Sequence, residues 1–348
     1  MKSRDRVALV LVAAFAPMVM AQESGVSFSH KNWELVCDNT NTCRAAGYSD
    51  GDESTGSVLF TRLAGPGTVP TGEVTLGDIE SDGANPVAAL TLWINDKSIG
   101  AVKAAADDTW RLSEDQTRAV ISAVKGSSRV EFRGGPSPFV LSGDGASAVM
   151  LKMDDVQGRI GTPGALARKG NKPESSVPVA IPAPVIQAVK VAKAQERPLT
   201  APEIAALKPK LLATLKPDDC DRLQPSADRD EEGEEAITLT PLGDKHAVIS
   251  ALCWRAAYNE GYGYWVIDSA LQEAPVLVTT LGADYGEGVI SYSQKGRGLG
   301  DCWGMGSWVW DGQTFRQSSE ATTGMCRYIR LGGTWSLPTF VADVKPAQ

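Results

Sequence analysis

The chain has 348 residues with 42 acidic and 34 basic side chains, which leaves a formal net charge of −8 at pH 7. This length is typical of two domains rather than one. The acidic balance makes nucleic acid a poor partner, because phosphate backbones repel a protein of like charge. A cationic partner is compatible with this charge, although acidic surfaces more often serve solubility.

The N-terminus has the pattern of a secretory signal peptide. A short basic start, Met1–Arg6, precedes an apolar run over Val7–Met20. That run is shorter than the ~20 residues that cross a bilayer, and the residues before the cleavage point suit signal peptidase. We expect residues 1–21 to be a signal peptide cleaved after Ala21, which leaves an exported mature chain with no membrane span.

Six cysteines follow the signal sequence, at Cys37, Cys43, Cys220, Cys253, Cys302 and Cys326. An even number in an exported protein indicates disulfides, because that compartment is oxidising. Several pairings are possible, and the connectivity stays open at this point. The simplest pairing joins each cysteine to its sequence neighbour, which gives Cys37–Cys43, Cys220–Cys253 and Cys302–Cys326.

The first domain is predicted to combine an antiparallel sheet with two or three helices. Alternating runs between turn residues predict strands at Trp33–Cys37, Cys43–Tyr48, Ser57–Leu63, Glu73–Ile79, Val87–Ile94, Arg129–Arg133 and Phe139–Ser142. A capping box at Ser113 begins one helix, which Gly126 ends. A second helix is expected over Ala146–Val156, and the following Gln-Gly pair stops it.

A proline-rich segment, Asn171–Pro184, separates the two halves of the chain. Its prolines exclude a helix or a central strand. We therefore expect an N-terminal domain over residues 22–170, a linker over 171–199 and a C-terminal domain over 200–348. Thr200–Glu203 has the pattern of a helix cap, and Pro209 is expected to break the helix that follows.

The second domain is predicted to be mainly antiparallel β-structure, as a sandwich or a meander, so that the whole chain is α+β. Its strands are expected at Ala236–Pro241, Ala247–Arg255, Tyr264–Asp268, Val276–Thr280, Val289–Ser293, Ser307–Trp310 and Thr314–Gln317. The Asp311-Gly312 pair suits a hairpin turn, since both residue types accept positive φ.

The stretch QKGRGLGDCWGMGSWVWDG, Gln294–Gly312, raises the question of a phosphate loop. Its first three glycines do not match G-x-G-x-x-G, and no helix is expected behind them to hold a phosphate. We interpret these glycines as positions where the backbone bulges or approaches a neighbour closely.

No metal or cofactor is predicted. His30 and His246 are the only histidines, and neither zinc spacing of histidines nor C-x-x-C occurs. The acidic loop 228–235 matches the first half of a calcium loop but lacks the glutamate that closes it. We expect a solvated loop there, and calcium binding stays open.

Catalytic residues are not predicted either. The chain has no G-x-S-x-G nucleophile elbow, and cysteines in disulfides cannot act as nucleophiles. Paired carboxylates remain as the alternative, because their distance in space is invisible in a sequence. The acids considered for this role are Asp284, Glu287 and Asp301.

An aromatic cluster is the most informative feature of the second domain. Its members are Trp254, Tyr258, Tyr262, Tyr264, Trp265, Tyr285, Tyr292, Trp303, Trp308 and Trp310. We expect most of these to form a core, with some at its rim, where aromatic faces suit glycan or peptide grooves. The candidate ligand-binding residues are Arg255, Asn259, Arg297, Asp301 and Trp303.

Several stretches agree with one family at once: NWELVCDNTNTC, MDDVQGRIGTPGAL, CWRAAYNEGYGYW, KGRGLGDCW, WVWDGQTF and TGMCR. Together they resemble the bacterial exported proteins known as domain of unknown function 1176, over nearly the whole mature chain. Asn32 stands where that family commonly has Asp. The first hairpin is also similar to that of invasion-associated locus B proteins. The resemblance implies export and disulfides, and it implies no activity.

These features predict a disulfide-bonded protein of the bacterial periplasm, or a secreted one. The leading hypothesis is a non-enzymatic binding or envelope-maintenance protein, whose partner is an unknown envelope ligand, glycan or protein. The alternative is a hydrolase acting on a cell-envelope polymer.

Overall fold

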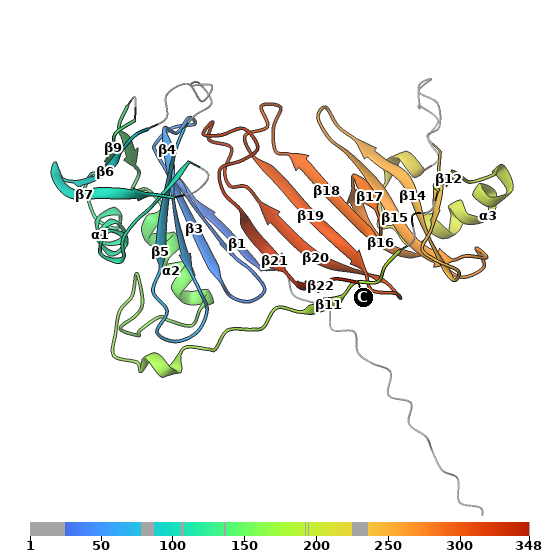
Figure 1. The fold of residues 1–348 in the computed structure, drawn as a ribbon, viewed down its shortest axis with the longest axis horizontal. Coiled ribbons are helices and arrows are strands. Elements are labelled where there is room, and N and C mark those ends of the chain that lie inside the picture. Colours follow the sequence, from blue (N-terminus) through green and yellow to red (C-terminus); the bar gives the residue numbers. More distant parts are fainter. Residues whose placement is uncertain are drawn as a thin grey trace, which may run out of the picture.

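A computed structural model describes residues 25–77, 87–105, 108–135, 137–191, 193, 195–224 and 236–347. Within these residues, three large sheets and three α-helices are arranged along the molecule (Figure 1). The predicted α+β class is therefore confirmed, with mostly antiparallel strands. The predicted signal peptide and the acidic loop 228–235 lie outside the described residues.

The N-terminal half forms one ten-stranded sheet in which all neighbouring strands are antiparallel. Its spatial order is β1 (Val26–His30), β2 (Trp33–Cys37), β3 (Cys43–Tyr48), β4 (Gly56–Arg62), β5 (Thr71–Leu76), β8 (Thr109–Arg111), β7 (Lys97–Ala104), β6 (Leu90–Ile94), β9 (Val130–Arg133) and β10 (Phe139–Leu141). The Cys37–Cys43 disulfide joins directly opposed residues of β2 and β3.

Two helices cover this sheet and close its core. Helix α1 (Glu114–Val124) starts at the predicted capping box of Ser113, where the side chains of Ser113 and Gln116 each accept from the other's backbone N–H. Helix α2 (Ala146–Val156) has the predicted bounds. Both helices bury their apolar faces in one cluster with the strands, because each is apolar along one side only.

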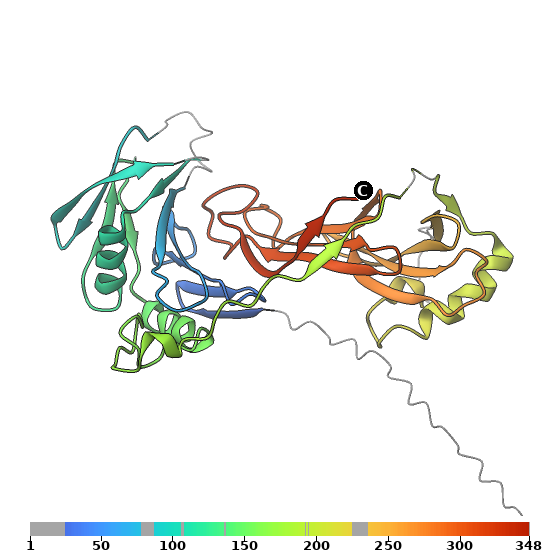
Figure 2. The same ribbon diagram turned by 60° about the horizontal axis from the view of Figure 1, so that its bottom comes forward.

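The linker runs along the C-terminal half rather than hanging free. After a short 3₁₀ turn, Glu174–Ser176, it becomes β11 (Val185–Gln187) and pairs in parallel with β22 (Asp343–Lys345), near the C-terminus. Figures 1 and 2 both show this yellow-green segment running alongside the orange and red strands. The linker therefore adds backbone hydrogen bonds between distant parts of the chain.

The C-terminal half contains two five-stranded antiparallel sheets. One has the order β12 (Arg197–Pro198), β13 (Thr238–Pro241), β14 (His246–Arg255), β15 (Glu260–Asp268) and β16 (Val276–Gly282), and the other has β17 (Asp284–Gly286), β18 (Val289–Lys295), β19 (Trp303–Trp310), β20 (Phe315–Thr322) and β21 (Leu337–Val341). Side chains from both sheets share one apolar cluster, around Tyr264 and Trp310. Helix α3 (Ala201–Leu212) and the 3₁₀ turn Asp221–Leu223 close a second cluster with the first of these sheets.

The prediction that Pro209 breaks the helix after Thr200 is wrong, since α3 continues through Pro209 to Leu212. Proline removes only one backbone donor, and the acceptor left without it is the carbonyl of Ala205. Ala205 is exposed, so water can satisfy that carbonyl. Hydration of this carbonyl therefore offsets part of the cost of the proline, whose ring still crowds the preceding turn.

The two halves of the chain pack against each other, which the sequence did not indicate. Ile329 and Leu337 are buried against Tyr48 in a cluster that also includes the half-buried Trp335. In Figure 1 the red C-terminal strands lie beside the blue N-terminal sheet. The Trp335 indole N–H donates to the Ser57 hydroxyl at 2.8 Å, so the contact is polar as well as apolar.

Candidate functional site

Loops that are far apart in the sequence meet at one end of the C-terminal half. We call this region the tip, and it consists of the turn 256–259, the loop 296–302 and the turn 330–333. The amide of Asn259 donates to the Lys295 carbonyl at 2.9 Å and accepts from the Lys295 N–H at 2.8 Å. The Gly332 N–H donates to the Gly300 carbonyl at 2.8 Å. The Asn259 side chain and the backbone hydrogen bond between Gly332 and Gly300 therefore hold the three segments together.

Arg297 and Asp301 form a two-bond ion pair across the central loop of the tip. The guanidinium Nε and Nη2 lie 2.7 and 2.6 Å from the carboxylate oxygens of Asp301. Asp301 is buried and also accepts from the Tyr328 N–H at 2.8 Å. Burial raises the pKa of Asp301, but these hydrogen bonds and the charge of Arg297 outweigh it and lower the pKa overall.

The other two predicted residues lie at the same end of the C-terminal half. The Trp303 indole N–H donates to the Gly300 carbonyl at 2.8 Å, and the Lys295 ammonium lies 5.5 Å from the Trp303 ring centroid. Arg255 forms an ion pair of 3.0 Å with Glu260 across the β14–β15 turn. The structure thus brings all five predicted residues to one region, where each has an intramolecular partner.

The glycines of this loop have steric explanations. A Cβ on Gly296 would lie 2.7 Å from the Cys302 sulfur, and one on Gly298 would lie 2.8 Å from the Tyr258 ring. Larger residues would push apart the Cys302–Cys326 disulfide region or the Tyr258 contact. The structure therefore shows close approaches at these two glycines, as the sequence analysis interpreted them.

Part of the tip surface remains apolar and exposed. Tyr258 is 64% exposed, Leu299 is 51% exposed and Leu331 is 62% exposed. Among the aromatic residues of the cluster, Tyr264, Trp265 and Trp310 are buried. The remaining ones are half-buried, apart from Tyr258.

The tip also lies beside the N-terminal half. The Arg327 carbonyl accepts from the Ser54 N–H at 2.8 Å, and the Arg327 guanidinium donates to the Gly51 carbonyl. The charges of Asp52 and Glu53 raise the pKa of Arg297, after the larger effect of its bond to Asp301. Ligand sites occur preferentially at such junctions between domains.

The acids considered for a hydrolase are not brought together as one group. Asp284 begins the strand β17 and pairs with Ser291, near the start of β18. Asp301 instead follows the C-terminal end of β18, which is Lys295. Asp284 lines a small polar cavity of about 280 Å³ with Glu196 and Glu260. Glu287 lines a neighbouring one of about 510 Å³. Asp301 lines neither cavity.

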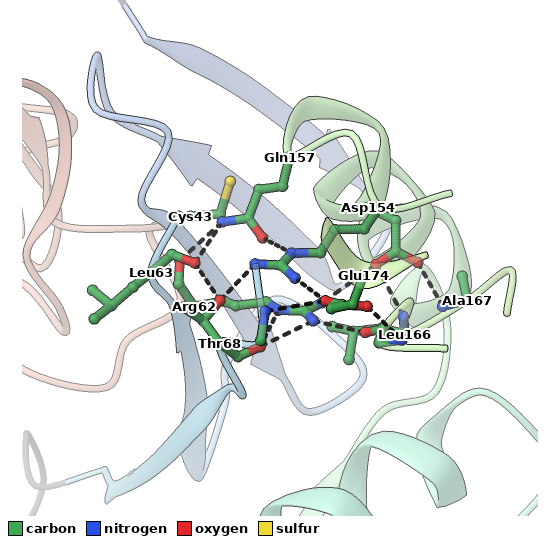
Figure 3. Close-up of polar contacts among 12 residues, drawn as sticks. Cys43, Arg62, Leu63, Thr68, Asp154, Gln157, Leu166, Ala167 and Glu174 are labelled. Atoms are coloured by element: carbon green, nitrogen blue, oxygen red, sulfur yellow. Dashed lines mark hydrogen bonds and ion pairs between the residues drawn. The ribbon is translucent and has the colours of Figure 1, made fainter. Parts of the chain in front are cut away.

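A second region, not predicted from the sequence, holds a group of four charges in the N-terminal half, of which three are buried and Glu174 is partly exposed (Figure 3). Asp154 accepts from the N–H groups of Leu166 and Ala167 at 2.9 and 2.8 Å, and its Oδ1 lies 3.5 Å from the Arg62 Nη1. Arg62 also donates to the Gly164 carbonyl at 2.7 Å. Burial lowers the pKa of Arg62 to about 10, so it stays cationic at neutral pH.

Arg159 and Glu174 complete this charged cluster. Arg159 is fully buried and donates to Glu174 at 2.8 Å, to Gln157 and to the β4–β5 loop. Glu174 also accepts from the N–H groups of Gly67 and Gly164. The cluster therefore fastens the segment 162–170 to the sheet. The spacing of Asp154 and Arg159 in MDDVQGRIGTPGAL was visible in the sequence, but not their common burial.

A cavity of about 670 Å³ lies beside this cluster, between α1, the β4–β5 loop and the segment 163–169. We call it the α1 cavity. Its volume is typical of small-molecule sites. Within the described residues, no group of three or more His, Cys, Asp or Glu side chains is placed to hold a metal ion. No described helix has both the length and the apolar character to cross a bilayer.

Comparison with known proteins shows the family to which the chain belongs. Residues 27–342 match the family described as "Protein of unknown function (DUF1176)", and the chain belongs to that family. It is similar to the "Uncharacterized protein YpfG" of Escherichia coli (strain K12), with 25% identity over 349 residues, which covers 93% of this chain and 95% of that protein. No solved structure matches the chain significantly.

Proposed function

We propose that this protein is a non-enzymatic binding protein of the bacterial periplasm, or a secreted one, and that it takes an envelope ligand at the tip. All six cysteines are in disulfides, which is compatible with an oxidising compartment. The signal sequence predicted for residues 1–21 supports the same compartment. Since the family carries no assigned activity, the proposal depends on the geometry of the tip.

The observation that carries the proposal is an exposed apolar surface on a fixed backbone. Tyr258, Leu299 and Leu331 are all more than half exposed. The loops beneath them are held by the Arg297–Asp301 ion pair, the Cys302–Cys326 disulfide and backbone hydrogen bonds. A rigid scaffold lowers the entropy that a ligand must overcome on binding, and an exposed aromatic ring provides a face for stacking.

An envelope glycan is the ligand class that we favour for the tip, with an envelope protein as the second class. Tyr258 would stack on a sugar ring, and the guanidinium of Arg297, whose side chain is 37% exposed, would donate outward to a hydroxyl or carboxylate. Asn259 and Asp301 would act from beneath, because their polar atoms already hold the loop. Trp303, half-buried beside Lys295, would report binding.

The alternative, a hydrolase of an envelope polymer, has less support from the geometry. Asp301 is buried against Arg297 and has no open path to act as an acid or base. Asp284 and Glu287 line cavities at the other end of β18. A glycosidase needs two carboxylates ~5–9.5 Å apart across its substrate. Activity lost specifically in Asp284→Asn would favour this alternative over a binding protein.

The proposal is tested by titrating the oxidised mature protein with peptidoglycan fragments and following tryptophan fluorescence. We expect a saturable change, and Tyr258→Ala should weaken binding about tenfold, as the loss of one stacking contact does. Val276→Ala is the matched control, because Val276 is also apolar and 59% exposed but begins β16 far from the tip. A flat response to every fragment, or equal weakening by both variants, would refute the glycan proposal.

A further inference from the structure

The α1 cavity combines apolar walls with several cations. Its apolar lining comes from Val69 and Pro70 of the β4–β5 loop, Ile121 of α1, and Pro163 and Leu166 of the segment 163–169. Ile121 and Leu166 are also members of the main core cluster, so this wall is continuous with the packed interior. An apolar ligand body would be removed from water there, which is the main driving force for such binding.

The basic side chains of this cavity outnumber the acidic ones. It is lined by Arg62, Arg118, Lys125 and Lys169, but by only two acids, Glu114 and Glu174. Each of the two acids already has a basic partner. Glu114 is bound to Arg118 at 2.6 Å, and Glu174 to Arg159 at 2.8 Å.

The charges that remain are the two lysines and part of the Arg62 charge. The Lys125 ammonium donates to a carbonyl, that of Leu166, and not to a carboxylate. Burial lowers the pKa of Lys125, and the nearby positive charge of Lys169 lowers it further. The charge of Asp154 offsets part of this effect. The two lysines still repel each other across the cavity, and a bound anion would relieve that repulsion. This local excess contrasts with the chain's net charge of −8.

Thr117 closes the inner side of the cavity, next to the sheet. It lines the cavity from α1 and is only 1% exposed. Its hydroxyl has no hydrogen-bond partner within the described part of the chain. Buried hydroxyls are normally hydrogen-bonded, because leaving one unpaired costs free energy. This oxygen is closed to solvent and lies beside Gly72 of β5, where an added Cβ would be 2.8 Å from it, so the hydroxyl packs against the sheet and not against a molecule in the cavity.

We propose that the α1 cavity binds an anionic amphiphile, a molecule with an acid group on an apolar chain. The acid group would lie between Lys125 and Lys169, and the apolar chain would lie against Ile121 and Leu166. A fatty acid and the phosphate end of a lipid share this chemistry. The site is separate from the tip, so this proposal does not depend on glycan binding.

Calorimetry on the oxidised mature protein tests the proposal with four ligands that share one chain: octanoate, octyl phosphate, octanol and octyltrimethylammonium. Both anions, or one of them, should bind at least about tenfold more tightly than the alcohol and the cation. Tighter octanoate binding would indicate a fatty acid, and tighter octyl phosphate binding a phospholipid. Equal affinity for all four ligands, or no binding by either anion, would overturn the proposal.

Variants assign the binding to this cavity. Lys169→Gln should weaken anion binding about tenfold and leave octanol unchanged. Lys152→Gln is the matched control, because Lys152 lies on α2 and pairs with Asp155 at 2.9 Å without lining the cavity. Ser122→Trp places a large side chain at an exposed lining position and should abolish binding of every amphiphile. Unchanged octanoate binding in both Lys169→Gln and Ser122→Trp would exclude this cavity.

A tip variant separates this proposal from the proposed function. Tyr258→Ala should leave octanoate affinity unchanged while it weakens glycan binding. If Tyr258→Ala removes octanoate binding and Lys169→Gln does not, the amphiphile binds at the tip and the assignment to the α1 cavity is wrong.

Discussion

The guanidinium of Arg297 covers the buried carboxylate of Asp301 through two hydrogen bonds of 2.7 and 2.6 Å. The Asp301 side chain is fully buried, whereas that of Arg297 is 37% exposed. The ion pair therefore neutralises a charge that water no longer reaches, at the base of the loop that carries Leu299. The same contacts lower the pKa of Asp301 in the folded state. A lowered pKa means that the ionised carboxylate stabilises the fold.

Removing this partner should destabilise the C-terminal half in a pH-dependent way. Arg297→Met leaves the Asp301 carboxylate buried with one backbone donor, and we expect a loss of about 2 kcal/mol at pH 7. Since the pKa of Asp301 is lower in the folded state, its ionised form stabilises the wild type above pH ~4, and that contribution is lost on further acidification. The variant should lose less stability below pH 4 in urea denaturation.

A matched control for Arg297→Met is Arg255→Met. Arg255 also pairs with an acid, Glu260, but both side chains are well exposed, at 37% and 43%. Exposed pairs contribute at most about 1 kcal/mol. If the two variants lose equal stability, the buried pair has no special role.

The charged cluster beside the α1 cavity should depend on Asp154 and not on its neighbour. Asp154→Ala removes the acceptor of the Leu166 and Ala167 N–H groups and leaves Arg62 without its counter-ion. We expect a loss of about 3 kcal/mol and faster hydrogen exchange over 162–170. Asp155→Ala is the control, since Asp155 is half exposed and pairs with Lys152 in a surface contact. Equal exchange in both variants would contradict a fastening role for the cluster.

The disulfides should differ in their contribution to stability. Cys302–Cys326 closes a separation of 24 residues, whereas Cys37–Cys43 closes one of 6. Chain entropy predicts losses of about 3 and 2 kcal/mol when each pair is replaced by alanines. Urea denaturation of the two double variants measures this order. A larger loss for Cys37–Cys43 would mean that native packing, and not loop length, dominates.

The contact between the two halves should weaken as pH rises. Burial raises the pKa of Glu34, even though Tyr48 and the Met325 N–H donate to it. The folded state therefore holds a proton that the unfolded state has released, and stability falls as pH rises from ~4.3 towards the folded pKa. Glu34→Gln keeps an acceptor and should remove this dependence. The midpoint of thermal unfolding across pH 4 to 8 would show it.

Glu73→Gln is the control for that experiment, because Glu73 pairs with the exposed Arg111 on the same sheet. It should leave the pH dependence between pH 4 and 8 as in the wild type. If Glu34→Gln retains the full dependence, another group controls the contact.

Local elements were predictable because their signals are local. The hairpin of β2 and β3 has the predicted bounds, since alternation and turn residues specify it. Helix α1 starts at its capping box. Strands β7, β8 and β21 were missed. Strand β7 has a mixed sequence although it pairs with its chain neighbour β6, whereas the short β8 is stabilised by pairing with β5, far along the chain.

The candidate sites were predictable only in part. The sequence indicated that residues near Arg297 belong with the aromatic cluster, and the structure brings them to one region. Whether they bind a ligand stays a prediction. The α1 cavity was not predicted, because Lys125 and Lys169 are unremarkable surface residues until the segment 163–169 folds back onto α1.

The amino-acid pattern by itself determined the α+β class, the bounds of α2 and the hairpin signals, and it favoured neighbouring cysteine pairs that the structure contains. Periodicity, capping and turn chemistry act over a few residues, so they can be recognised from the sequence alone. Only the tertiary structure decided that Ile329 and Leu337 pack on Tyr48, and that Arg62 and Asp154 share one buried site. Such contacts join residues across long separations, where burial and charge compensation in three dimensions select among many possible partners.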